Sequence, residues 1–217
     1  SITMGAFTGI LDFSANDNNV TLATFSNTGT GIRTLNMGDG TWTLTGTGTI
    51  WNQTTITGLT FNSNASILAI AASTAPSAER AVVLGASLTY NAIAISDPVI
   101  SATAERVPIS FTSASNTITS FSITNAYWIK FPNTTTIITN GFSYSGSQGS
   151  GVLIQSQDTN NQFTLSVGGV VTLSWAALQN VIKSGVGSIT ATNSFDLGGN
   201  TGVSITGPSG GARFIGG

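Results

Sequence analysis

The chain has 217 residues, of which 40% are hydrophobic and only 6% are charged, and its formal net charge is −2. It contains neither His nor Cys, so imidazole chemistry, thiolate chemistry, disulfides and thiolate metal sites are excluded. The hydrophobic fraction is too high for a disordered segment, and the composition predicts a folded scaffold.

The charged residues form no basic cluster that could follow the phosphates of a nucleic acid, and the isoelectric point is about 4.7. No stretch of the sequence approaches the roughly 20 apolar residues of a membrane span. We therefore expect that neither nucleic acid nor membrane is a partner of this protein.

Alternation of apolar and polar residues is the main local signal along the chain. From Thr41 to Ile50 every odd position is Thr, which predicts a strand with one hydroxylated face and one packed face. Turn residues separate most of the other short runs that predict strands. These runs are Val20 to Phe25, Ile56 to Phe61, Val107 to Phe111, Ile118 to Ile123, Gln162 to Val167 and Val170 to Trp175.

An irregular repeat of the pattern apolar-x-x-apolar-x-apolar is superimposed on these runs. The distance from the start of one copy to the start of the next is uneven, but it is always of the size of one coil of a solenoid. The four copies are Ile32/Leu35/Met37, Ile56/Leu59/Phe61, Tyr90/Ile93/Ile95 and Ile118/Phe121/Ile123.

A tripeptide repeat places charges at matching positions. Ala78-Glu79-Arg80 recurs as Ala104-Glu105-Arg106, again at about the distance of one solenoid coil. If consecutive coils stack in register, the two Glu-Arg pairs would lie about 4.8 Å apart as contacts between coils or subunits. Chance recurrence in a sequence of biased composition is the alternative.

Two segments near the C-terminus are less regular. The run from Trp175 to Ile182 has the apolar spacing of a short helix, while Trp175 also ends an alternating strand pattern, so both structures stay open. Residues 207–217 are rich in Gly and Pro and predict an extended arm, with Arg213 and Phe214 as anchors on a neighbouring chain or fraying in solvent. Residues 1–206 are predicted to form a single domain.

Carboxylates are the remaining acid–base candidates, and a glycosidase needs two of them across the scissile bond. Most of them stand beside Asn or Gly and are typical of turns, including the segment from Asp12 to Asn18, which lacks the Gly and Glu of a calcium loop. The aspartates in question are Asp12, Asp17, Asp39, Asp97, Asp158 and Asp196. The pattern favours turns over a catalytic pair, and Asp39 and Asp158 are the residues that a polysaccharide-cleaving alternative would depend on.

Three aromatic residues are candidates for stacking on sugars, although core packing is the more common role of such residues. They are Trp51, Trp128 and Tyr144.

Several stretches taken together resemble a family of Thr/Gly-rich structural proteins of environmental tailed bacteriophages. The stretches are 33–48 (RTLNMGDGTWTLTGTG), 58–62 (GLTFN), 88–91 (LTYN), 162–166 (QFTLS) and 193–202 (NSFDLGGNTG). After Gly202 the chain departs from the family pattern, with Val203 where relatives tend to place an aromatic residue. The resemblance implies a right-handed parallel β-helix, trimeric, used on the surface of the virion, with no catalytic motif to transfer.

The sequence thus predicts an all-β fold, a right-handed parallel β-helix, with an antiparallel β-sandwich or jelly roll as the alternative. The expected function is that of a non-enzymatic capsid decoration or cement protein, and the alternative is a tail fibre or tailspike component that binds host glycans. We expect a homotrimer that contacts the major capsid protein or other virion proteins, without cofactor or metal. The candidate contact residues are Glu79, Arg80, Glu105, Arg106, Arg213 and Phe214.

Overall fold

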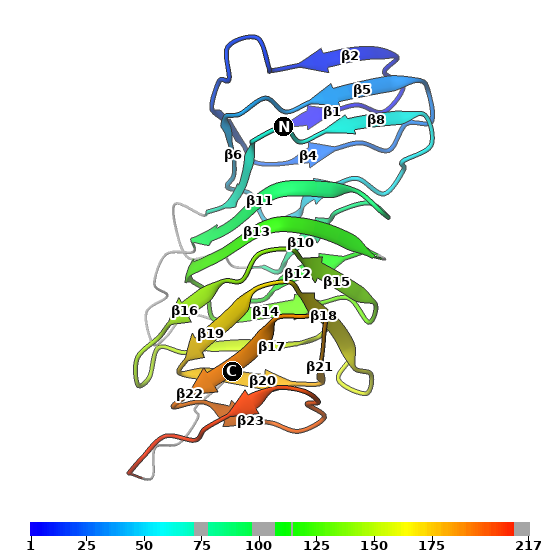
Figure 1. Ribbon diagram of the computed structural model, residues 1–217. Helices are drawn as coiled ribbons and strands as arrows, with labels where there is room; N and C mark the ends of the chain where they lie inside the picture. The colour runs from blue at the N-terminus through cyan, green and yellow to red at the C-terminus, as the bar shows by residue number, and fades with distance from the viewer. Residues whose placement is uncertain (72–77, 97–106, 114, 211–217) are drawn as a thin grey trace.

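The computed structural model describes residues 1–71, 78–96, 107–113 and 115–210. In this part of the chain every residue in regular structure is in a strand, and the strands wind into a parallel β-helix that runs from the first coils to the last along one axis (Figure 1). All ladders between its strands are parallel. The parallel β-helix expected from the sequence is confirmed, and an antiparallel sandwich is excluded.

Two sheets run along most of the helix and form its main faces. The nine-stranded sheet contains, in spatial order, β1 (Ile2–Thr3), β4 (Phe25–Ser26), β7 (Gly48–Asn52), β10 (Arg80–Val83), β12 (Ile109–Thr112), β14 (Trp128–Phe131), β17 (Val152–Ser156), β20 (Ala176–Gln179) and β23 (Phe195–Asp196). The eight-stranded sheet contains β3 (Val20–Leu22), β6 (Thr41–Leu44), β9 (Ile67–Ile70), β11 (Thr89–Ser96), β13 (Asn116–Asn125), β15 (Thr135–Ile138), β18 (Phe163–Val167) and β21 (Val181–Ser184).

The other faces are built from different sheets at the two ends of the helix. In the N-terminal coils the chain passes from the nine-stranded sheet through a three-stranded sheet to the eight-stranded sheet, and the three strands are β2 (Gly9–Asp12), β5 (Arg33–Asn36) and β8 (Leu59–Asn62). In the C-terminal coils it passes from the nine-stranded sheet through the eight-stranded sheet to a four-stranded sheet of β16 (Ser143–Ser145), β19 (Val170–Ser174), β22 (Ser188–Thr192) and β24 (Ser204–Ile205). The eight-stranded sheet changes position at the long strands β11 and β13.

Coil length varies along the helix because the corners differ in length and because a few ladders contain a shift of register, as between Ala81 and Val82. On the nine-stranded sheet Trp51 pairs with Val82, whereas Leu178 pairs with Asp196 after a much shorter coil. The predicted repeat is therefore correct only locally. Ile93 lies opposite Phe121, as the repeat predicted. Leu35 lies opposite Phe61 rather than Leu59, because that coil is slightly longer than the spacing of the repeat.

Alternation predicted the buried positions, but not the corners. In β6 both Thr41 and Thr43 face outward and Trp42 is fully buried, as expected. The predicted single strand nevertheless ends at Leu44, and β7 begins in another sheet. At the corner between them a Cβ on Gly46 would collide with the carbonyl oxygen of Ala23, so only glycine fits against the neighbouring coil.

The helix alternative for Trp175 to Ile182 is wrong, because this run forms parts of two strands. Trp175 and Asn180 adopt positive φ angles of 55° and 60°, which turn the chain at both ends of β20 and direct β21 into a different sheet. Of the residues with the i, i+3 and i+7 spacing, only Leu178 is buried in a strand, whereas Trp175 lies at the turn and Ile182 is only partly buried on β21.

Aromatic side chains stack along the axis inside the coils. Phe25 stacks on Trp51 with ring centroids 4.5 Å apart, and Trp42 meets the edge of Trp51. Phe131 lies between Phe111 and Phe163, with centroid distances of 5.3 and 5.2 Å. Because each ring covers the ring of the next coil, the aromatic stacks make the solenoid stiff along its axis.

A polar cluster is enclosed in the N-terminal coils. Arg33 is 1% exposed, and its guanidinium donates hydrogen bonds to the carbonyl oxygens of Thr55 and Thr57 and to Oδ1 of Asn27. Asn27 in turn donates to the Gln53 side chain one coil further on. The cluster fixes the corners that connect these coils.

Candidate interaction surface

The aspartates of the described residues lie in turns or at the ends of strands that lead into turns, and they shape those turns. The backbone N–H of Asp39 donates to Oδ1 of Asp17 at 2.8 Å, and the N–H of Ala65 donates to Oδ1 of Asp39 at 2.9 Å. Asp158 and Asp196 each accept a hydrogen bond from the backbone N–H two residues on. These contacts explain the aspartates as turn residues, while Asp97 lies outside the described residues.

The segment that begins at Asp12 forms a turn of the same kind. The backbone N–H and the hydroxyl of Ser14 both donate to Oδ1 of Asp12, and these bonds, followed by a smaller one from Asn36, lower the pKa of the Asp12 carboxyl. Within the described ranges no group of three or more acidic residues is arranged to hold a metal ion.

The predicted stacking of the two Glu-Arg pairs does not match the strand register. Arg80 is fully buried at the start of β10, and its partner on β12 is Ile109 rather than Arg106. The coil is longer than the spacing of the sequence repeat, so the two arginines are not ladder partners. Glu79 is exposed beside Arg80, and Glu105, Arg106, Arg213 and Phe214 lie outside the described residues.

Two of the three aromatic candidates for sugar binding belong to the interior. Trp51 is fully buried and donates from Nε1 to the Tyr90 hydroxyl at 3.0 Å, and Tyr144 is only 6% exposed. Trp128 is half-buried on the nine-stranded sheet, where Nζ of Lys130 lies 4.4 Å from the centroid of its ring. Of these three residues, Trp128 is the one that keeps part of its surface available.

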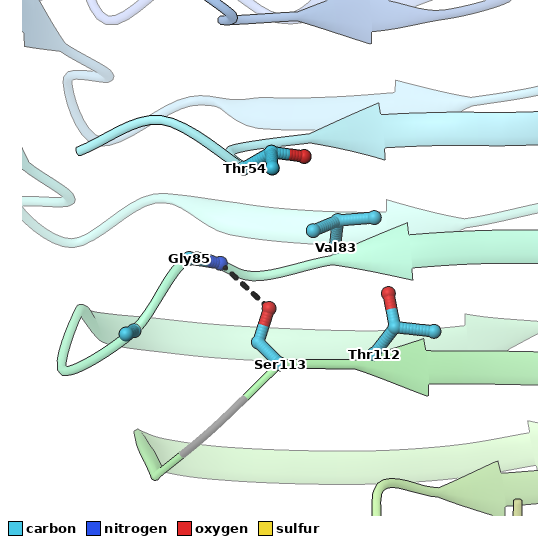
Figure 2. Close-up of a pocket in the computed structure, with 6 residues that line it drawn as sticks. Thr54, Val83, Gly85, Thr112 and Ser113 are labelled. Carbon is cyan, nitrogen blue, oxygen red and sulfur yellow. Dashed lines mark hydrogen bonds between the residues drawn. The ribbon is translucent and has the colours of Figure 1, made fainter.

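A hollow of about 310 Å³ lies at one end of β10 and β12, and Figure 2 shows the side chains that surround it. The N–H of Gly85 donates to the hydroxyl of Ser113 across two neighbouring coils. None of the residues that line it is ionisable, so the hollow offers no acid or base for catalysis. They are Thr54, Val83, Gly85, Ala86, Thr112 and Ser113.

The outward face of β3, β6, β9 and the C-terminal halves of β11 and β13 carries no charge. The strand register aligns its side chains in two rows, one of Thr21, Thr43, Ala69, Ala94 and Ser122 and the other of Thr41, Ile67, Ala92 and Ser120. These positions carry small or β-branched uncharged side chains. We call this surface the uncharged face.

The uncharged face is suited to contact another surface. Five strands at the usual spacing of about 4.8 Å extend over roughly 19 Å along the axis. Apolar and hydroxyl groups alternate on it, so a partner could bind without the cost of removing water from charges.

Sequence reasoning identified the hydroxylated side of one strand, at Thr41 and Thr43, but not the face to which that strand belongs. The remaining residues come from other strands of the sheet, and their alignment depends on corner lengths that periodicity does not reveal. The feature that could have indicated the face is the absence of charge from the alternating runs.

No helix of the described residues is long and apolar enough to cross a membrane. Comparisons with protein-family models, with curated proteins and with solved structures find no match to the chain.

Proposed function

We propose that the protein is a non-enzymatic structural protein of a bacteriophage particle, a homotrimeric capsid decoration or cement protein on the particle surface. Two independent lines of support exist. One is the resemblance of 33–48 and 193–202 to structural proteins of tailed phages. The other is the uncharged face on a stiff parallel β-helix, and this observation carries the proposal.

A decoration protein has to bind many equivalent positions on a shell by matching its shape. The uncharged face provides backbone-ordered hydroxyl and methyl groups on strands that cannot shift individually, because each inner strand is held by ladders on both sides. Such a preordered surface loses little conformational entropy on binding.

The test is the occupancy of purified particles of the phage that encodes the chain. Quantitative mass spectrometry should find a copy number comparable to that of the major capsid protein, and imaging should place the protein on the head. A count of a few trimers per particle would contradict a decoration role.

A pair of alanines tests the face itself. Ala94 lies on the uncharged face, and Ala81 is half-buried at an outward position of the nine-stranded sheet. We expect Ala94→Lys to reduce binding to undecorated heads by at least about tenfold, since a buried unpaired ammonium is costly, and Ala81→Lys to leave it unchanged. Equal binding by both variants would exclude this face as the contact surface.

The alternative function is attachment to host glycans as part of a tail fibre. The half-buried Trp128 favours it, since the part of a tryptophan surface that stays accessible can stack on a sugar ring. This alternative predicts a low copy number on the tail and glycan binding that is lost in Trp128→Ala.

A further inference from the structure

The sequence contains one Asn-Gly pair, Asn140-Gly141, and it lies at the corner between β15 and β16. Asparagine before glycine is the pair most prone to an intramolecular reaction, because glycine has no side chain to keep its backbone nitrogen away from the carboxamide. The Asn140 side chain is exposed to solvent. Within the ranges that the structure describes, neither the Asn140 carboxamide nor the Gly141 N–H takes part in a hydrogen bond, so both reacting groups are available.

Two other asparagines that precede a small residue, Asn62 and Asn193, are restrained by hydrogen bonds. The Asn62 carboxamide donates to the Asn36 side chain in the neighbouring coil at 2.5 Å. Behind Asn193 the N–H of Ser194, which would have to attack, donates to the carbonyl oxygen of Thr206 at 2.9 Å. At each of these sites one of the two reacting groups is engaged, so the fold singles out Asn140.

We propose that Asn140 is a modification site that converts spontaneously to aspartate and isoaspartate. The Gly141 nitrogen attacks Cγ of Asn140, the Cγ–Nδ2 bond breaks, and the proton of the Gly141 N–H leaves with the side-chain nitrogen as ammonia. Water then opens the resulting cyclic succinimide. Opening at Cγ gives aspartate, and opening at the backbone carbonyl carbon gives isoaspartate, in which the main chain runs through Cβ and Cγ. Water is the only co-reactant, and the inference does not depend on a role in a virion.

The corner at Asn140 has no room for a longer main chain. A Cβ on Gly141 would collide with the carbonyl oxygen of Val170 in the next coil, and the N–H of Asn140 donates to the carbonyl oxygen of Thr119 in the preceding coil at 3.0 Å. Isoaspartate lengthens the main chain by one carbon atom between these contacts, whereas aspartate leaves the main chain unchanged. Only isoaspartate should therefore disturb the packing of the coils.

Incubation of the purified protein in mildly alkaline buffer tests the reactivity, since base removes the proton of the attacking N–H. Peptide mapping by mass spectrometry, combined with enzymatic methylation of isoaspartyl carboxylates, measures the conversion of each asparagine. In the folded protein Asn140 should react at least about tenfold faster than Asn62 and Asn193. In guanidinium chloride, where their hydrogen bonds are lost, Asn62 and Asn193 should react faster than they do in the folded protein.

Two variants at this position separate the reaction from its effect on the fold. Asn140→Gln should stay unmodified over the same time, because its longer side chain would have to close a larger ring, which forms more slowly. Fresh Asn140→Asp should melt like the fresh wild type, because its main chain is unchanged. Wild-type protein that has formed isoaspartate should melt at least about 2 °C lower, while incubated Asn140→Gln should keep its melting temperature.

The proposal is overturned if Asn140 stays intact in the folded protein and reacts only in guanidinium chloride, or if Asn62 and Asn193 react as fast as Asn140 in the folded protein. A melting temperature that is unchanged after isoaspartate has formed would overturn the constraint that we infer at the corner. Particle occupancy plays no part in these measurements, so their failure leaves the proposed virion role as a separate question.

Discussion

Tyr90 shows how a single polar group is accommodated inside the coils. Its hydroxyl donates to the carbonyl oxygen of Leu84 at 2.7 Å and accepts from Nε1 of Trp51, so three buried polar groups satisfy one another. Burial raises the pKa of Tyr90 far above its ordinary value of 10.0, and the Trp51 hydrogen bond offsets only a smaller part.

The raised pKa predicts a loss of stability at alkaline pH. The folded state keeps the Tyr90 phenol protonated, while the unfolded chain releases that proton above pH 10.0, so stability is complete below this pH and falls as the pH rises beyond it. Because of this group the free energy of unfolding should fall by up to about 1.4 kcal/mol per pH unit. Urea denaturation at neutral pH and at pH values above 10 measures it.

Tyr90→Phe separates the two effects of this residue. At neutral pH it should cost about 1–3 kcal/mol, because the Leu84 carbonyl and the Trp51 N–H lose their partner. At alkaline pH its stability should fall less steeply than that of the wild type. Tyr144, whose pKa is also raised by burial, contributes to the slope that remains. If the stability of Tyr90→Phe fell with pH as steeply as that of the wild type, the alkaline loss of stability would not come from Tyr90.

At the scale of the elements, the strands are short because glycine corners bring consecutive coils into backbone contact. A Cβ on Gly169 would collide with the backbone nitrogen of Gly141, and one on Gly187 would collide with the carbonyl oxygen of Gly169. The three glycines therefore form one column along a corner of the C-terminal coils.

This column predicts a strong dependence on position for substitutions of glycine by alanine. Gly169→Ala should destabilise the protein by at least about 2 kcal/mol, since the backbones of two coils would have to separate. Gly207→Ala is the matched control, because a Cβ there meets nothing within 4 Å. Thermal melts compare the two variants, and similar melting temperatures would contradict the close approach of the coils.

The corners also explain where reasoning from the sequence succeeded and failed at this scale. The inward positions Ile93 and Phe121 were matched correctly, because β11 and β13 are long strands in register. Leu35 was matched to the wrong residue, and Trp175 was left open between helix and strand. In both cases the outcome depends on how many residues a corner contains and on positive φ angles, to which the alternation of apolar residues is insensitive.

At the scale of the whole molecule, stability should vary along the axis, since each coil contacts only its neighbours. Leu22 and Leu44 are ladder partners in the same inward column, but Leu22 is partly buried in the first coil and Leu44 is fully buried in the second. We expect Leu44→Ala to cost about 2–5 kcal/mol and Leu22→Ala about 1 kcal/mol in dilute solution.

Urea denaturation of the two variants measures this difference. Equal costs for both variants would contradict the difference in burial between the two leucines.

The sequence by itself determined the class of the fold and the sorting of side chains, because the two-residue period of a strand is written directly in the alternation of residues such as Thr41, Trp42 and Thr43. It also indicated turns near most of the aspartates, and the described ones lie in turns or at strand ends that lead into turns. Only the tertiary structure decided which residues stack on one another, that Arg80 lies opposite Ile109, and that uncharged side chains of β3, β6, β9, β11 and β13 share one face. Stacking depends on the number of residues in each coil, and the corners set that number through close contacts between backbones that are distant in the sequence.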